Sequence, residues 1–541
     1  MRLTYVASFA AVLVGSAAAT LRQVVVVSRH GVRGPYGMGA DTPSEELIKK
    51  YVRNPAIDLP LSAKAWGTAE TEDPSEIVSP KLTKHGYRVV ERMGEYFRQH
   101  LYRDFLDDTT CPQAYAYADA NQRDNLTAEA LLGGSFPACK EIVPTTEGTR
   151  LLFEQGQDPT ATCPVCSRTV YEGIAGAPDC RYLIQESREE IEELNSILDC
   201  CAPAACVSEG GNDTNASTCS FFDIPTTWNG AFYQPWKDPL SSADYFSEFL
   251  LLQALNNMTL PAELPFEKIL SLSKIHEAHM DLVTNEVNSA NFGATLLAHM
   301  TASFEQTATE KAIPLPDGEG PTLTQSLDNR FLLYTAHDIN ILYLRNLLRL
   351  QWLTDGWHPH QATLGGMLIF ELHTSTDESP ELKVARKLKA GVKQEDYYVK
   401  AYFVTASPQQ MRNEEVLSAS NPPYVVPVMI PLCSDDVILP NGTIEVRCPF
   451  KTFKSLIGRT LKKECVADTL RPFVKSLSDN GSDPSDNSGG VIHLSTLLWV
   501  VFGVLIASFL VIVGRHFLIR RRHPAGVQKA EYGTVPQVSS E

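Results

Sequence analysis

Short, bounded apolar runs recur along the chain, and several of them end in residues that can do chemistry. Val24–Val27 are four consecutive β-branched residues, a pattern typical of a strand buried on both faces. Similar runs predict strands at Tyr115–Ala118 and Phe331–Ala336, and later ones at Met367–Leu372 and Tyr397–Val404. The long connection between the last two fits an antiparallel pair at the sheet edge. We therefore expect an α/β fold with a mostly parallel central sheet and flanking helices.

Helical periodicity follows several of these strands. One helix is predicted from about Lys84 to Leu101 with Thr83 as its N-cap, another runs from Leu126, and a third follows the strand that ends at Ala336. Between about 136 and 329 amphipathic helical stretches predominate. We interpret this segment as a largely helical inserted cap that roofs a pocket and sets selectivity. The α/β core would then comprise residues 21–135 and 330–470.

Composition and charge narrow the class of protein. At 541 residues the chain is expected to contain two folding units and accessory segments. Its 43% hydrophobic and 21% charged residues are ordinary for a globular protein. The formal net charge of −17 argues against a general nucleic-acid binder, which needs a broad basic face. Any anion site in this chain must be a local concentration of cations.

Both ends of the chain indicate the secretory pathway. Arg2, an apolar run and small residues up to Ala19 predict a signal peptide at residues 1–19. Residues 492–514 are apolar over a bilayer's width and precede a cluster of arginines, so they predict a single transmembrane helix with a cytoplasmic tail at 515–541. A polar segment before it, residues 471–491, is interpreted as a flexible stalk. In the tail, Tyr532-Gly-Thr-Val535 looks like a tyrosine-based sorting signal that a sorting adaptor would bind.

Cysteines and sequons agree with that route. Twelve cysteines, an even number, predict disulfides in an oxidising lumen. Cys163-Pro-Val-Cys166 alternatively begins a zinc site, but no second pair follows at zinc-ribbon spacing. N-glycosylation sequons, which are typical of secreted surfaces, begin at Asn125, Asn212, Asn215, Asn257, Asn441 and Asn480.

The loop after the first strand carries the strongest chemical signal. Arg29, His30 and Arg33 lie within five residues of one another. Two guanidinium groups can grip the oxygens of a phosphoryl group with fork geometry, and a neutral imidazole between them can attack phosphorus. The alternative is that these residues are exposed in a surface turn and have no catalytic or binding role. A loop at the carboxyl end of a central parallel strand is, however, where α/β proteins place ligand sites.

Several motifs in order resemble one family. Arg29-His30-Gly31-Val32-Arg33-Gly34-Pro35 closely resembles the RHGxRxP signature of the histidine acid phosphatases (histidine phosphatase superfamily, branch 2). His337-Asp338 resembles that family's His-Asp pair, and the segment Asp119–Arg123 resembles the one that supplies a third phosphate arginine. The similarity runs from about Val24 to Cys465 and is loose in the insert.

This resemblance implies a role for each residue. His30 would be the nucleophile, and Asp338 the general acid and then the general base. Arg29, Arg33, Arg123 and His337 would bind the phosphoryl oxygens, and neither a metal nor a cofactor would be required.

Two departures from the family bear on the third arginine. Asp124 follows Arg123 where many relatives have Thr, and an added carboxylate could weaken the anion site. The Asn125 sequon almost touches Arg123, so we expect Asn125 to carry no glycan.

The resemblance also implies disulfides. Cys433 and Cys448 would form a local bridge, Cys465 would join a cysteine of the insert, and Cys111 would pair with Cys139. The other histidines are interpreted as structural: His276 and His279 lack zinc-protease spacing, His358 and His360 lie in a loop, and His85 packs at a helix start.

Taken together, the sequence predicts a membrane-anchored acid phosphatase that hydrolyses phosphate monoesters and is similar to the lysosomal or endosomal type. It would be a type I membrane protein with its site in the lumen or outside the cell. Alternatives are a more selective phosphatase for phytate, sugar phosphates or lysophosphatidate, and an inactive surface binding protein. No nucleic acid is expected as a partner, and a homodimer is left open.

Overall fold

The computed structural model describes residues 20–479, except 38–43, 68–79, 106–110, 112, 147–162, 177–180, 208–218, 263, 316–322, 324, 375–396 and 440–441. The predicted signal peptide, transmembrane segment and sorting signal (Tyr532, Val535) lie outside the described residues. So do four predicted glycosylation sites, Asn212, Asn215, Asn441 and Asn480, whereas Asn257 is described and exposed. Within the described ranges, none of the helices has the length and apolar character that crossing a membrane requires.

An eight-stranded sheet runs through the described residues in the order β2-β5-β1-β6-β7-β10-β9, with β8 also paired to β7. Its strands are β1 (Thr20–Arg29), β2 (Ala114–Ala118), β5 (Phe331–Ala336), β6 (Met367–Thr374), β7 (Tyr397–Thr405), β8 (Tyr424–Val428), β9 (Asp435–Ile438) and β10 (Ile444–Pro449). β1 and β2 each pair with β5 in parallel, and the other pairings in this sheet are antiparallel.

The sheet is therefore mixed, and the prediction of a mostly parallel sheet was wrong. Burial of Val24–Val27 on both faces was the basis of that prediction, but it reflects helices that cover both faces and not the direction of neighbouring strands. β1 pairs in parallel with β5 on one side and antiparallel with β6 on the other. β6 and β7 are antiparallel as expected, yet they lie inside the sheet and not at its edge.

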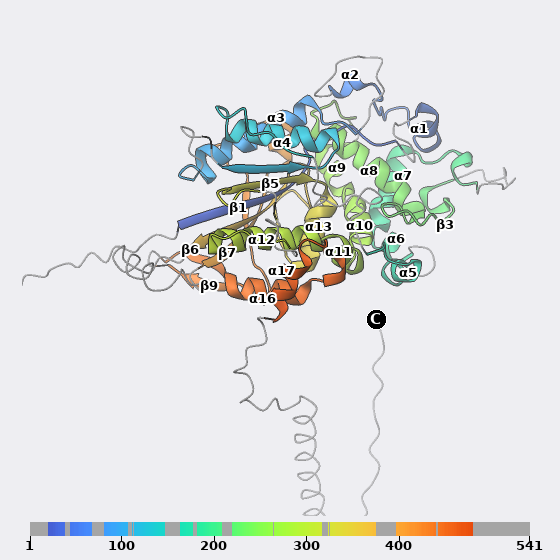
Figure 1. Cartoon of the computed structure of the whole chain (residues 1–541). Helices are drawn as coiled ribbons and strands as arrows, with labels where there is room; N and C mark the ends of the chain where they lie inside the picture. The colour runs from blue at the N-terminus through green and yellow to red at the C-terminus, as the bar shows by residue number, and fades with distance from the viewer. Residues whose placement is uncertain are drawn as a thin grey trace, which may run out of the picture. The chain divides into compact units, whose positions relative to one another are not determined.

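Alternate valines of β1 enter two separate cores. Val24 and Val26 pack with residues of α3 (Lys84–Tyr96) and α4 (Gln122–Ser135) on one face. Val25 and Val27 pack with α12 (Ala294–Thr309), α13 (Asp338–Leu348), α16 (Phe450–Thr460) and α17 (Arg471–Asp479) on the other. Figure 1 shows α3 and α4 on one side of the strands and α12 and α16 on the opposite side. Since the side chains of a strand alternate, one apolar run ties both layers to the sheet.

Two helix boundaries position the site. Thr83 caps α3 by accepting a hydrogen bond from the backbone N–H of Gly86 at 2.9 Å, as the sequence predicts. The helical path continues past α3 as a π-helix at Phe97–Leu101, so the predicted end at Leu101 is right. α4 begins at Gln122, four residues before the predicted start at Leu126. Arg123 consequently lies in the first turn of a helix.

The segment interpreted as an insert is helical in its described part and does more than cap the core. It contains α5 (Arg168–Ala175), α6 (Arg181–Glu186), α7 (Arg188–Leu198), α8 (Pro239–Leu255), α9 (Phe266–Leu272), α10 (Lys274–Val283), α11 (Glu286–Phe292) and α12, with the small hairpin β3 (Thr227–Trp228) and β4 (Trp236–Lys237). Because α12 shares a core with β1, part of this segment belongs to the layer that covers the sheet. The described residues also include the short helices α1 (Glu45–Tyr51), α2 (Ala63–Trp66) and α15 (Pro408–Asn413).

The predicted stalk begins too early. Residues 471–479 form α17, which packs against α16. Phe473, Val474 and Leu477 are buried, and this apolar stripe at helical spacing is why the segment folds onto the core and is not an extended linker.

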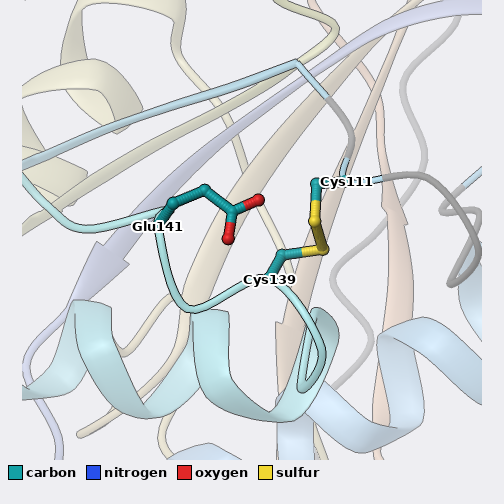
Figure 2. Close-up of side chains that lie close together, drawn as sticks. All are labelled: Cys111, Cys139 and Glu141. Atoms are coloured by element: carbon teal, nitrogen blue, oxygen red, sulfur yellow. A yellow bond between two sulfur atoms is a disulfide. The ribbon is translucent and has the colours of Figure 1, made fainter.

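Disulfides join distant parts of the chain. The structure pairs Cys433 with Cys448, Cys111 with Cys139, and Cys465 with Cys163 of the insert, which are the pairings expected from the sequence. It adds Cys200–Cys201 and Cys206–Cys219 and leaves the buried Cys166 reduced. Glu141 lies beside the Cys111–Cys139 bridge (Figure 2), but both sulfur atoms are in the disulfide, so these three residues are not a metal-binding set.

Close contact between α3 and α4 gives a test of this packing. A Cβ added at Gly134 would meet the carbonyl oxygen of Glu91 at 2.2 Å, whereas at Gly133, one position earlier, nothing lies within 4 Å. We expect Gly134→Ala to lower the free energy of unfolding by about 1–3 kcal/mol through overpacking. Gly133→Ala should raise it by about 0.5–1 kcal/mol, because Ala favours the helix. Urea unfolding of both variants measures the difference, and equal effects would contradict the described contact.

Candidate active site

Residues from three parallel strands and one helix start meet at one edge of the sheet. Arg29 ends β1 and His30 follows it, His337 and Asp338 follow β5, and Asp119 follows β2. Arg123 joins them from the first turn of α4, and Arg33 from the loop after β1. All of these residues are buried, with at most 9% of each residue exposed. Since the carboxyl ends of parallel strands meet at one edge, the structure brings together every phosphate-site residue named from the sequence.

The imidazole of His30 is held in its neutral form. Its Nδ1 lies 2.9 Å from the carbonyl oxygen of Gly31, which can only accept, so Nδ1 carries the proton and Nε2 has the free lone pair. Burial lowers the pKa of His30 well below its usual value, and the charges of Arg123, Arg33 and Arg29 lower it further. The residue therefore stays unprotonated at acidic pH, where a free histidine would be charged.

Each of two arginines is paired with a carboxylate. Arg29 Nη2 lies 2.7 Å from Asp338 Oδ2, while its Nη1 donates to the carbonyl of Ala362 at 2.7 Å. Arg33 Nη2 donates to Glu248 Oε1 at 2.6 Å, and the same oxygen lies 3.6 Å from Arg29 Nη2. Glu248 thus occupies a position between two guanidinium groups. Burial would raise the pKa of Glu248, but Arg33, His276 and Arg29 lower it, so it is ionised there.

The third arginine lies against His337. Arg123 Nη2 is 3.4 Å from His337 Nδ1, and His337 Nε2 is 2.8 Å from Asp119 Oδ2. Burial opposes a charge on His337, yet Asp124 and Asp119 raise its pKa. Asp119, Asp124 and His337 would fit a cation by distance alone, but the Arg123 guanidinium already supplies positive charge beside them.

Asp124 and Asn125, the departures noted in the sequence, have distinct places. Asp124 does not point away from the phosphate-binding residues named from the sequence, Arg29, Arg33, Arg123 and His337, which we call the clamp. Asp124 is fully buried, with one carboxylate oxygen 3.7 Å from His337 Nδ1 and the other 3.8 Å from Arg123 Nε. Asn125 is half-buried on α4, and Thr127, whose hydroxyl completes the sequon, is fully buried and bonded to the backbone of Arg123 and Gly31. The absence of a glycan at Asn125 stays a prediction, which this packing favours.

Asp338 lies between a guanidinium and an imidazole. Besides Arg29, it faces His276 Nε2, which is 3.5 Å from Oδ2. Burial would raise the pKa of Asp338, but Arg29 and His276 hold it well below the usual range. Its other oxygen, Oδ1, accepts a hydrogen bond from the N–H of Ile339 at the start of α13. The carboxyl group is therefore fixed in place next to the clamp.

Sequence reasoning missed four residues of this site. Glu248 and Asp244 come from α8, His276 comes from α10, and Tyr36 lies over Arg33 with the Arg33 Cζ atom 4.4 Å from the ring centroid. His276 was interpreted as structural because its spacing excluded a zinc motif, and the structure corrects that interpretation. A signal was present in α8, where two carboxylates four residues apart are the only charged residues of the helix. His85, by contrast, packs as expected, with Nε2 2.7 Å from the carbonyl of Met411.

Comparison with known proteins agrees with this geometry. A buried cluster of arginines around a neutral histidine at the edge of an α/β sheet can bind the oxygens of a phosphoryl group and present a nitrogen lone pair to it. The model of the histidine phosphatase superfamily (branch 2) matches residues 20–403, and the chain belongs to that family. Family membership supports a phosphoric monoester hydrolase.

The chain is similar in sequence to a phytase and to a glucose-1-phosphatase. The chain is 25% identical to phytase AppA of Escherichia coli (strain K12) over 435 residues, covering 77% of this chain and 87% of that protein. It is 22% identical to glucose-1-phosphatase of Providencia rettgeri over 459 residues, covering 82% and 92%. The solved structure of Hafnia alvei phytase in complex with tartrate has a TM-score of 0.61 at 22% identity, covers 83% of this chain and 98% of its own, and shows a shared fold.

Glu248 gives a test of the clamp. Its carboxylate occupies the space between two arginines that an incoming anion would need, so Glu248→Gln should tighten the binding of inorganic phosphate by about tenfold, because a like charge is removed. Isothermal titration at pH 5.5 measures the dissociation constant. Glu305→Gln, which breaks a partly buried pair with Lys454 away from the site, is the matched control. Weaker phosphate binding in Glu248→Gln would mean that Glu248 holds the arginines in place instead of competing for them.

Proposed function

We propose that this protein is an acid phosphatase that hydrolyses phosphate monoesters through a phosphohistidine intermediate. The observation that supports this most is the unprotonated Nε2 of His30 among three buried arginines. Nucleophilic attack requires the lone pair, and the transition state requires positive charge fixed around the phosphoryl oxygens. One arrangement of side chains supplies both.

The proposed reaction has two steps. In the first, His30 Nε2 attacks phosphorus, the N–P bond forms, the bond to the ester oxygen breaks, and a proton from Asp338 reaches the departing oxygen. In the second, Asp338 takes a proton from water, the water oxygen attacks phosphorus, and the N–P bond breaks to release phosphate. Arg29, Arg33 and Arg123 carry the charge of the phosphoryl oxygens in both steps, with His337 beside Arg123.

Carboxylates around the clamp favour substrates with one phosphate group. Asp244 and Glu248 of α8 lie near His276, and burial raises the pKa of Glu277 on α10 to about 7, in the field of His276, Arg29 and Asp338. At pH 5 Glu277 is largely protonated, so a second or third phosphate on the substrate would be repelled chiefly by the ionised Glu248, whereas an alcohol or sugar hydroxyl could donate hydrogen bonds to these acidic groups. A sugar phosphate is therefore the more selective alternative, and phytate fits less well.

The rival function, an inactive surface binding protein, has no physical need for both a nucleophile and an acid. His30 and Asp338 are present and oriented, which supports the enzyme. We further propose that the site faces the lumen or the outside of the cell, on a type I membrane protein of endosomes, lysosomes or the cell surface. The disulfides support an oxidising compartment, and the tail with Tyr532 and Val535 would reach a cytoplasmic sorting adaptor.

Hydrolysis of p-nitrophenyl phosphate by the purified full chain at pH 5, with EDTA present, tests the reaction. We expect turnover that His30→Ala abolishes and that Asp338→Asn reduces by roughly 10²–10⁴-fold, because the general base that activates water in the second step is lost. A phosphorylated enzyme that is labile to acid should be trapped in the wild type and absent in His30→Ala. Turnover that survives in His30→Ala would contradict the mechanism.

Substrate choice is tested by comparing kcat/KM for glycerol 2-phosphate, glucose 1-phosphate and phytate. We expect both monophosphates to exceed phytate by about tenfold or more, because clustered carboxylates repel the additional phosphates. Added salt should narrow the gap by screening that repulsion. A preference for phytate at low salt would contradict the assignment to simple monoesters.

A further inference from the structure

Two helices of the insert, α8 and α10, place the pair of Asp244 and His276 beside Asp338. These helices pack against each other (Figure 1). His276 on α10 is 2% exposed, its Nδ1 lies 2.9 Å from Asp244 Oδ1 on α8, and its Nε2 lies 3.5 Å from Asp338 Oδ2. The imidazole therefore bridges two carboxylates, one of which is the proposed general acid.

This arrangement addresses a difficulty in the mechanism. A general acid must hold a proton before the ester bond breaks, but Asp338 contacts the Arg29 guanidinium at 2.7 Å, and its pKa is well below the usual range despite burial. Burial lowers the pKa of His276, yet Asp244, Asp338 and Glu248 together raise it well above its usual value. Before substrate binds, the proton of the pair is thus on the imidazole and not on the carboxylate.

We propose that His276 stores the proton that Asp338 delivers to the leaving oxygen, and that Asp244 holds His276 in the tautomer and orientation that this transfer needs. This inference rests on the proposed function. His276 is a positioning residue in this account, since it acts through Asp338 and does not touch the reacting atoms.

In this proposal, binding of the negatively charged substrate triggers proton transfer from His276 to Asp338. When a phosphoryl group binds Arg29, it shares the cation that otherwise stabilises the Asp338 carboxylate, so the proton moves from His276 Nε2 to Asp338 Oδ2. Asp338 then gives this proton to the ester oxygen as the P–O bond breaks. In the second step Asp338 removes a proton from the attacking water and returns it to His276. The protons balance over the two steps, and no other reactant is required.

Charged groups around His276 are consistent with a stored proton. α8 presents Asp244 and Glu248, the start of α13 presents Asp338, and the end of β1 presents Arg29. On its own helix, His276 has Glu277 as a neighbour and His279, whose Nε2 lies 2.7 Å from the carbonyl of Tyr233. On the other helices packed against α10, Glu190 pairs with Lys274 of α10, Glu193 pairs with Lys268, and Arg168 pairs with Glu172.

The test uses two substrates that differ in their need for a proton. p-Nitrophenolate leaves as a stable anion, whereas the alkoxide of glycerol 2-phosphate must be protonated as it leaves. In the full chain, His276→Asn should reduce kcat for glycerol 2-phosphate by about 10²-fold or more and reduce kcat for p-nitrophenyl phosphate by less than about tenfold. The KM values should change little, because the arginines are untouched.

The pH profile gives a second readout. In the wild type the basic limb of the kcat profile reports loss of the proton that His276 and Asp338 share. Before substrate binds, this proton lies on His276, whose raised pKa sets the position of the limb. Without His276, Asp338 alone must hold the proton beside Arg29, so the basic limb for glycerol 2-phosphate should move to lower pH by about one unit or more. Asp244→Asn, which removes one anion from His276, should shift the limb in the same direction.

His358→Asn is the matched control, since His358 is a partly buried histidine whose Nε2 lies within hydrogen-bond distance of a backbone carbonyl, that of Leu270, at 3.0 Å. It should leave both the substrate ratio and the basic limb unchanged. Equal losses for both substrates in His276→Asn, with an unshifted limb, would overturn the inference while the proposed function stands. If His276→Asn does not fold, Asp244→Asn decides by the same two readouts. A wild-type chain without phosphatase activity would instead contradict the proposed function itself.

Discussion

Burial of three guanidinium groups in one small space is the constraint on which the rest of this structure depends. Arg29, Arg33 and Arg123 are at most 5% exposed, and a buried charge is costly unless an opposite charge and hydrogen bonds offset it. The offset comes from Asp338 on Arg29, Glu248 on Arg33, and Asp124 near Arg123. The site without substrate is therefore an array of charge pairs, and a phosphoryl group replaces part of the protein's own negative charge when it binds.

The same cations control the protonation of His30, the proposed nucleophile. Because His30 is buried among the arginines, a proton on its ring would add a further positive charge to the cluster, and its pKa falls accordingly. Phosphate binding and nucleophile activation are consequently one electrostatic arrangement. A substitution that removed one arginine would weaken the clamp and also raise the pKa of His30, so the loss of activity would depend on pH and would not be a uniform loss of affinity.

The sequence pattern predicted those features of the fold and the site that adjacent residues encode. The strand at Val24–Val27 and the motif after it are encoded by adjacent residues, so Arg29, His30 and Arg33 could be assigned from the chain alone. The direction of β6 beside β1 could not, because a strand buried on both faces has the same residue pattern in parallel and antiparallel pairs. Glu248 and His276 were missed because they reach the site through the packing of α8 against α10, which no short motif encodes.

The sheet edge and the insert helices contribute different groups to the site. The ends of β1 and β5 and the first turn of α4 supply the cations and the proposed nucleophile, which any phosphate monoester would need. Insert helices supply the carboxyl groups of Asp244, Glu248 and Glu277 and the imidazole of His276, which in the proposed mechanism meet the leaving group or govern its protonation. Changes in α8 and α10 can therefore alter which ester is cleaved and at which pH, while the phosphate clamp and its sheet stay the same.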